Sequence, residues 1–233
     1  MKKSVRLVIV SLVLAGLALT VGPWAYINFI KDDAPDALNL ETAPTDTANN
    51  EGVKATGLTD ANGEWKVLAN SDSVVGYRVK EILFGQDTEG VGRTKDVTAS
   101  LTISNNIVSA GSFTVQMGTI MSDAAKRDAQ FNNRIMDVAT YPTSTFTLTT
   151  PISLPDNALS GEVITAEATG ELTLRGTKKP VSFPIQAQVD GDSFTVVGNI
   201  TIVFDEWDIP EPGIPGITVE PQGLLEFSLV FTR

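Results

Sequence analysis

The sequence predicts an all-β domain that begins at residue 58, built as an antiparallel sheet that is curled into a barrel or folded as a sandwich. Apolar and polar residues alternate with a period of two in many segments; Val97, Ala99, Leu101 and Ile103, for example, are separated by polar residues. Such alternation is typical of half-buried strands. Only one segment reads as a helix, so strands and helices do not alternate as they do in a parallel sheet.

The alternating segments give the expected elements in order. Strands are predicted at 65–68, 74–81, 96–103, 111–117, 145–149, 162–174, 181–189, 194–204 and 223–232. Turns rich in Asn, Asp, Pro or Gly separate several of them, at 104–106, 154–157 and 190–192. Residues 121–131 contain alanines and no β-branched side chain after Ser122 or Asp123, either of which is a suitable N-cap, so a short helix is expected there.

The N-terminus has the pattern of a membrane anchor. Three basic residues lie within the first six, and residues 7–30 contain no charged side chain. This length is sufficient to cross a hydrocarbon core of about 30 Å, and the preceding charges place the N-terminus inside. We therefore expect a single-pass membrane protein whose C-terminal domain is extracytoplasmic. A cleavable signal peptide, which would give a secreted protein, is the alternative, although Gly22-Pro23-Trp24 is unfavourable for cleavage.

Residues 31–57 separate this segment from the predicted domain. They are rich in Asp, Glu, Ala, Pro, Thr and Asn and contain few side chains that could build a core. As a flexible coil they would reach on the order of 30 Å. The expected domains are therefore an anchor at 1–30, a flexible acidic linker at 31–57 and a β-barrel at 58–233.

Composition excludes several classes of function. The 233 residues include no Cys and no His, which removes Cys nucleophiles, Ser-His-Asp triads and zinc fingers. The formal net charge of −11 argues against a nucleic-acid partner, because such binding depends on Lys and Arg that neutralise phosphates. The acidic cluster at 205–211 lacks the spacing of a calcium-binding loop and is interpreted as a solvated loop. No metal or cofactor is expected.

Two blocks of sequence resemble the YceI-like family of bacterial lipid-binding barrels. The first reads Lys-Arg-Asp-Ala-Gln-Phe from residue 126 and reaches a Tyr-Pro pair, and the second reads Gly-Glu-Leu-Thr-Leu-Arg-Gly-Thr-Lys-Lys-Pro-Val from residue 170. The matching positions are Arg127, Asp128, Tyr141, Pro142, Gly170, Gly176 and Pro180. The resemblance covers roughly 64–233, and the apolar N-terminus is similar to membrane-anchored actinobacterial members.

The sequence departs from the family pattern in two places. Many members carry His where this chain has Gln130, so a His-dependent polar contact has no counterpart here. Residues 205–221 are longer and richer in Pro than the pattern, so the barrel mouth near Trp207 is expected to have a different shape.

The resemblance implies a lipocalin-like antiparallel barrel with a long apolar interior that holds an isoprenoid or other lipid chain. Alternation along the strands predicts a set of apolar residues that point inward. Each of them is either part of a cavity lining or an ordinary core residue. These cavity candidates are Tyr77, Val79, Leu101, Phe113, Val115, Phe146, Leu148, Phe183, Phe204, Phe227 and Leu229. Small residues such as Ala166, Ala187 and Gly198 suggest that side chains do not fill the barrel.

Three classes of function follow from these observations: a lipid carrier or sequestering module, an envelope scaffold or adhesion domain with a filled barrel, and an enzyme acting on envelope lipids. The enzyme is disfavoured, because neighbouring helix residues such as Arg127 and Asp128 point about 100° apart and are expected to bind separate structural partners. The expected partners are a lipid or isoprenoid ligand and, through the N-terminal segment, the membrane. A homodimer is left open.

Overall fold

The computed structural model describes residues 21–22, 25, 34–40, 57–213 and 216–233. Most of the expected anchor at 1–30 and of the linker at 31–57 therefore lies outside the described residues. Within the described ranges, no helix has the length and apolar character needed to cross a membrane.

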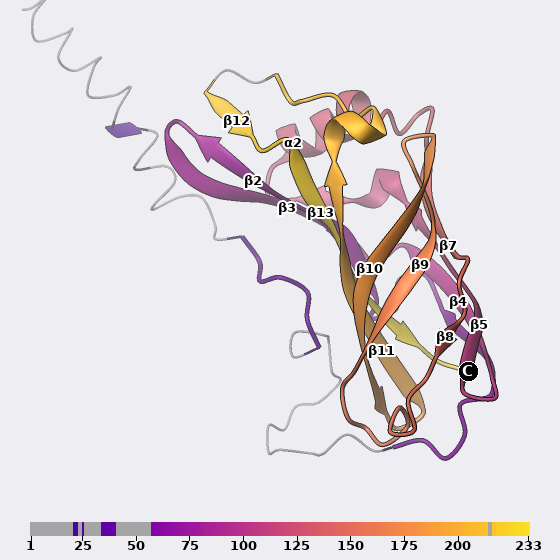
Figure 1. The fold of residues 1–233 in the computed structure, drawn as a ribbon. Helices are drawn as coiled ribbons and strands as arrows, with labels where there is room; N and C mark the ends of the chain where they lie inside the picture. Colours follow the sequence, from indigo (N-terminus) through magenta and orange to yellow (C-terminus); the bar gives the residue numbers. More distant parts are fainter. Residues whose placement is uncertain (1–20, 23–24, 26–33, 41–56, 214–215) are drawn as a thin grey trace, which may run out of the picture.

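In the part of the chain that the structure describes, thirteen strands form one strongly curled antiparallel sheet (Figure 1). The strand order is β1-β4-β5-β7-β9-β10-β11-β13-β2-β3-β6, with β8 paired to β5 and β12 paired to β2. An isolated bridge between Lys66 and Thr232 brings the end of β13 to β1. The strands are β1 (Gly63–Val67), β2 (Val74–Leu83), β3 (Gln86–Thr94), β4 (Val97–Ser104), β5 (Ile107–Gln116), β6 (Met121–Ser122), β7 (Thr143–Leu148), β8 (Ile152–Ser153), β9 (Ile164–Leu174), β10 (Thr177–Asp190), β11 (Ser193–Val203), β12 (Ile217–Val219) and β13 (Gln222–Phe231).

The predicted all-β, antiparallel fold with one short helix is confirmed, and every predicted strand has a counterpart in the sheet. Strand β3 was not predicted. Its sequence is polar and contains Gly90 and Gly92, which disfavour strands in general. A Cβ on Gly92 would collide with the ring of Tyr77, at 2.4 Å, and one on Gly90 would make a tight contact of 3.2 Å with the guanidinium of Arg127.

The predicted helix at 121–131 is wrong at its start. Helix α2 spans Ala125–Gln130 and continues as a π-helical turn, η2, over Phe131–Ile135. Met121–Ser122 instead pairs with β3 as β6. Ser122 is not an N-cap, because its backbone N–H and its hydroxyl both donate to Asp128 Oδ1, at 2.8 and 2.7 Å.

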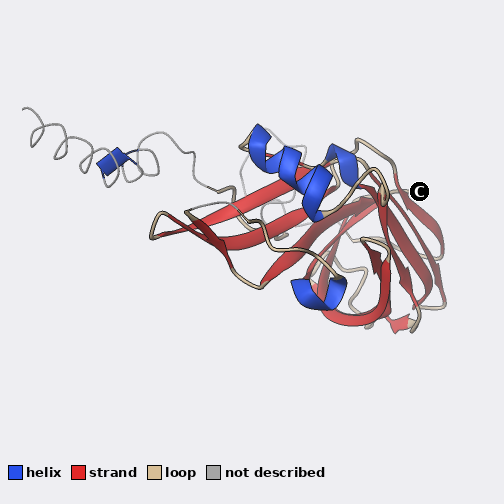
Figure 2. Ribbon diagram, turned by 90° about the horizontal axis from the view of Figure 1, so that it is seen from above, coloured by secondary structure: helices blue, strands red, loops and turns tan. Residues whose placement is uncertain are grey.

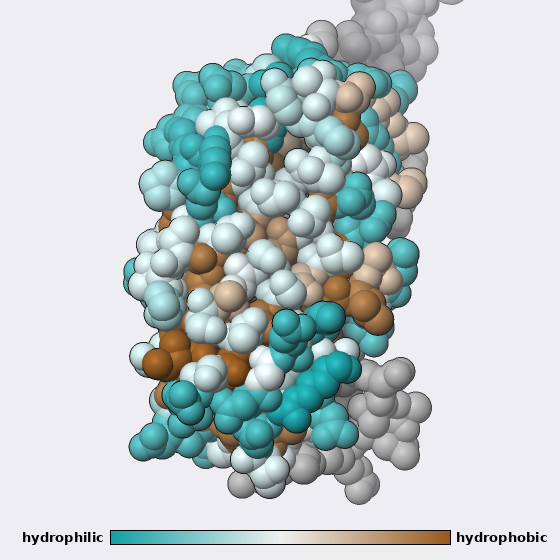
Figure 3. Space-filling model, turned by 90° about the vertical axis from the view of Figure 1, so that its right-hand side faces the viewer, coloured by the Kyte–Doolittle hydropathy of each residue, from teal (hydrophilic) through white to brown (hydrophobic). Residues whose placement is uncertain are grey.

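The helical segments gather at one end of the curled sheet, which we call the upper end (Figures 1 and 2). It carries α2, η2 and the 3-10 turn η3 (Phe204–Trp207), and the β4–β5 and β10–β11 hairpin turns lie at the opposite, lower end. The core fills the inside of the curl, whereas the outer faces of β4 and β5 carry serines and threonines such as Ser100 and Ser112. Figure 3 shows this side, with near-neutral side chains over its middle and hydrophilic ones at both ends.

A candidate apolar ligand site inside the barrel

Described residues enclose a cavity of about 350 Å³ inside the curled sheet, at its upper end. Strands β2, β5, β11 and β13 form its walls, and α2 and η2 lie across it. Its apolar lining includes Ile120, Phe131, Leu174, Ile202 and Leu225. Charged side chains enter the lining where α2 meets β2, so the cavity is apolar at depth and polar at one side.

A smaller cavity has a volume of about 130 Å³ and lies at the lower end. Its walls come from β4, β5, β7, β9, β10, β11 and β13, and its lining is almost entirely apolar. Small residues on two strands, Ala166 on β9 and Ala187 on β10, leave part of this space open.

All eleven nominated cavity residues line one of the two spaces, but they are divided between them. The upper cavity is lined by Tyr77, Val79, Val115 and Phe204. The lower cavity is lined by Leu101, Phe113, Phe146, Leu148, Phe183, Phe227 and Leu229. Ile202 and Leu225 were missed. Leu225 lies two residues from the nominated Phe227 on the same face of β13, and Ile202 lies two residues before the nominated Phe204, which begins η3.

Four of the nominated residues form a closed ring of aromatic contacts. Phe113 on β5 contacts Phe146 on β7, with ring centroids 5.4 Å apart, and Phe146 contacts Phe183 on β10 at the same distance. Phe227 on β13 closes the ring, with its centroid 5.9 Å from those of both Phe183 and Phe113. All four side chains are buried. We call this set the phenylalanine ring.

Glycines on the two intervening strands make room for the phenylalanine ring. A Cβ on Gly170 of β9 would lie 2.3 Å from Phe146 Cζ, and one on Gly198 of β11 would lie 2.7 Å from Phe227 Cζ. Gly198 is directly opposite Phe227 in the register of β11 and β13. The space that these glycines leave is therefore taken by aromatic rings and is not open cavity.

The polar side of the upper cavity is held by ion pairs. Arg127 donates to Glu81 Oε1 at 2.9 Å and also pairs with Asp123, one turn earlier. Burial lowers the pKa of Arg127, but the two carboxylates outweigh burial and the pKa lies above its ordinary value. Arg127 is therefore a fixed positive charge whose two terminal nitrogens already bind carboxylates.

An aromatic pair lies beside these charges. Tyr77 stacks on Phe131 with ring centroids 5.0 Å apart and an interplanar angle of 14°. Burial raises the pKa of Tyr77 to about 12, an effect that the nearby Arg127 partly opposes. Gln130, at the position where many family members carry His, also lines the upper cavity, and its Oε1 atom is buried with no hydrogen-bond partner among the described residues.

The remaining motif positions make structural contacts. Asp128 binds Ser122 and not the partners of Arg127. Gly176 has a φ of +76° and packs against the ring of Tyr141, where a Cβ would lie 2.4 Å from Cε1. The Pro142 carbonyl accepts a hydrogen bond from the Met117 N–H at 2.9 Å, and Pro180 lies opposite Glu171 in the β9–β10 ladder.

The acidic loop at 205–211 makes polar contacts with neighbouring side chains. Lys179 Nζ lies 3.7 Å from Glu206, and Thr177 donates to Asp208 at 3.2 Å. Across the described ranges, no group of three acidic side chains is placed to hold a metal ion.

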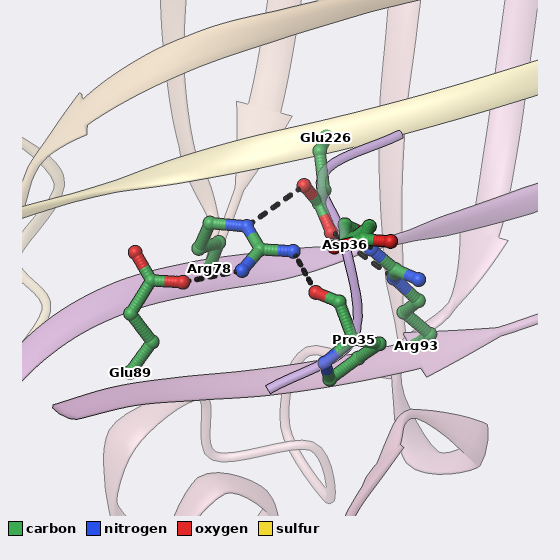
Figure 4. Close-up of polar contacts among 6 residues, drawn as sticks. All are labelled: Pro35, Asp36, Arg78, Glu89, Arg93 and Glu226. Carbon is green, nitrogen blue, oxygen red and sulfur yellow. Dashed lines mark hydrogen bonds and ion pairs between the residues drawn. The ribbon is translucent and has the colours of Figure 1, made fainter. Parts of the chain in front are cut away.

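A buried ion cluster lies on the outer face of β2, β3 and β13 (Figure 4). Glu226 is 3% exposed and accepts hydrogen bonds from Arg78 at 3.2 Å and from Arg93 at 2.8 Å. Arg78 also binds Glu89 at 2.5 Å and the Pro35 carbonyl at 2.6 Å. Arg93 also donates to the carbonyl of the next residue, Asp36. Residues 34–40, within the expected flexible linker, therefore pack on the barrel wall.

Comparison with known proteins identifies the family. The model of the YceI-like domain matches residues 65–231. A solved polyisoprenoid binding domain from Saccharophagus degradans is 13% identical, with a TM-score of 0.57 over 72% of this chain and 98% of that one. BcnA from Burkholderia cenocepacia is 18% identical, with a TM-score of 0.54 over 67% of this chain and 95% of that one. No curated protein matches. The two structures support the same fold, and the match over most of the chain shows that the protein belongs to the YceI-like family.

Proposed function

We propose that the domain binds the apolar chain of a lipid or isoprenoid inside the barrel, as a carrier or sequestering module. The observation that carries this proposal is the upper cavity of about 350 Å³, which is lined mainly by apolar side chains and closed on one side by α2. Burial of a chain there is favourable at about 0.8 kcal/mol per methylene group. Cavities of this kind, with a few convergent polar groups, are typical ligand sites.

The polarity of the cavity orients the ligand. An apolar chain is stable against the deep lining of Ile202 and Leu225, whereas a polar head would remain beside α2 and β2. The buried Oε1 atom of Gln130 offers such a head a hydrogen-bond partner. Membership of the YceI-like family and the likeness to a polyisoprenoid binding domain support a ligand of this class.

We also propose that the protein is a membrane-anchored, extracytoplasmic member of the family, of the actinobacterial type. The basic residues before the uncharged stretch at 7–30 support this orientation. Protease added to intact protoplasts should then remove the domain. Survival of the domain under conditions in which lysed protoplasts are digested would refute the orientation.

The binding role is proposed in place of catalysis, because Arg127 and Asp128, the two charged residues of the motif on α2, already have structural partners. Arg127 binds Glu81 and Asp123, and Asp128 binds Ser122. The sequence contains no Cys or His that could act as a nucleophile or a neutral-pH base. These contacts suit a wall that closes a cavity.

A pair of substitutions on β11 tests the binding site. Ile202 is buried and lines the upper cavity, whereas Thr201 is exposed on the opposite face of the same strand. Ile202→Asp places a carboxylate in an apolar space, where desolvation disfavours it strongly. We expect it to reduce uptake of farnesol at least tenfold, measured by native mass spectrometry on folded protein.

Thr201→Asp is the matched control and should leave uptake within twofold of the wild type. Equal losses in both variants would place the ligand outside the upper cavity. The proposed function itself would be contradicted if the wild-type protein took up neither farnesol nor a longer isoprenoid alcohol.

A further inference from the structure

We propose that the phenylalanine ring is a partition that limits the length of the bound chain by confining it to the upper cavity. This inference rests on the proposed function and adds a length limit to it. Phe113, Phe146, Phe183 and Phe227 all line the lower cavity, and none of them lines the upper one.

The strands show that the phenylalanine ring lies between the two spaces. On β5, Val115 lines the upper cavity, and Phe113, two residues away on the same face, lines the lower one. The same change occurs on β13, between Leu225 and Phe227, and on β7, between Ser144 and Phe146. Three strands therefore pass from one cavity to the other at the level of the phenylalanine ring.

Packing around the phenylalanine ring blocks this level of the barrel. Leu172 on β9 is 0% exposed and Ile200 on β11 is 3% exposed, and neither lines a cavity. Gly170 and Gly198 allow the Phe146 and Phe227 rings to lie over β9 and β11. Rings packed on several sides cannot turn aside without displacing their neighbours, because protein interiors are close-packed.

The cavity volumes give the length limit. A cavity of about 150 Å³ is known to hold benzene, which corresponds to roughly 25 Å³ per carbon atom. By this measure the upper cavity of about 350 Å³ holds roughly 14 carbon atoms. The lower cavity of about 130 Å³ would add roughly five, which is one isoprene unit. A chain of three isoprene units has about 15 carbon atoms and should therefore fit above the partition with its head at the polar side of the cavity, whereas a chain of four, with about 20, should not.

The test compares farnesol, with three isoprene units, and geranylgeraniol, with four, by native mass spectrometry of the full chain. Wild type should bind farnesol at least tenfold more tightly. Phe183→Ala removes one member of the phenylalanine ring and should reduce this preference at least fivefold. Phe183→Leu, the milder variant, should shift it in the same direction. Adding Ala187→Leu, which fills the lower cavity, to either variant should restore the wild-type preference.

Ala187→Leu alone tests the partition without altering the phenylalanine ring. With the partition closed, it should leave the affinities for both alcohols unchanged. A wild-type protein that binds both alcohols equally, with Ala187→Leu weakening geranylgeraniol, would overturn the partition while leaving the proposed function intact. An unchanged length preference in folded Phe183→Ala would overturn it as well. Failure of wild type to bind either alcohol would overturn both proposals.

Discussion

Tyr77 is a partly buried phenol at the wall of the proposed ligand site, and its ionisation should affect stability. Its pKa is raised from 10.0 to about 12, mainly by burial. The unfolded chain ionises first as pH rises, so the contribution of Tyr77 to stability is complete below pH 10 and is lost between about pH 10 and pH 12. We expect the free energy of unfolding in urea to fall over this range by more in the wild type than in Tyr77→Phe.

The comparison with Tyr77→Phe removes the contribution of lysines and of the other tyrosines, which titrate in both proteins. The expected difference between the two falls is on the order of 2 kcal/mol. Parallel stability curves for the two proteins would show that the Tyr77 phenol titrates as it does in water.

The sequence was most informative about individual inward residues. Alternation alone placed Tyr77, Phe113 and the other nominated residues toward the inside, because side-chain direction in a strand follows directly from position. It could not show that four phenylalanines from β5, β7, β10 and β13 meet, since that depends on the pairing and curl of strands far apart in the chain. For the same reason, the sequence suggested open space at Gly198, where the structure places the Phe227 ring.

At the level of elements, β6 and α2 act as one unit that covers the upper cavity. Asp128 Oδ1 accepts two hydrogen bonds from Ser122 and so ties the end of β6 to the helix. Asp128→Ala leaves the Ser122 N–H without this partner, and we expect a loss of about 1 to 3 kcal/mol in the free energy of unfolding. Amide hydrogen exchange should become faster at residues 121–135, measured by mass spectrometry.

The exposed Asp192 in the β10–β11 turn provides a control for the loss of one negative charge. Asp192→Ala should leave exchange at 121–135 unchanged. Equal exchange in wild type and Asp128→Ala would mean that packing, and not Asp128, fixes α2 across the cavity.

The elements that sequence reasoning missed or misplaced depend on contacts between distant segments. Strand β3 is polar and contains two glycines because Tyr77 and Arg127 pack closely against it. The start of α2 was placed too early because Ser122 resembles an N-cap, although its partner is the side chain of Asp128 in the middle of the helix. Strand β12 has three residues and pairs with β2, and a strand of this length carries no periodic signal of its own.

On the scale of the whole molecule, the outer ion cluster connects residues 34–40 to the barrel wall. The carbonyl groups of Pro35 and Asp36 bind Arg78 and Arg93, which also share the buried carboxylate of Glu226 (Figure 4). From its composition the linker was expected to be a flexible coil. The contacts of Pro35 and Asp36 could not be predicted, because every residue has a backbone carbonyl that could bind an arginine. If residues 7–30 cross the membrane, few residues would separate the bilayer from the wall formed by β2, β3 and β13.

Native mass spectrometry of the full chain shows whether this curled sheet holds an apolar chain. The protein would be extracted from its native host in mild detergent and measured before and after denaturation. We predict a complex that carries one apolar lipid, released on unfolding and reduced at least tenfold in Ile202→Asp but not in Thr201→Asp. A folded protein that carries no lipid and takes up none of the isoprenoid alcohols offered would contradict the account.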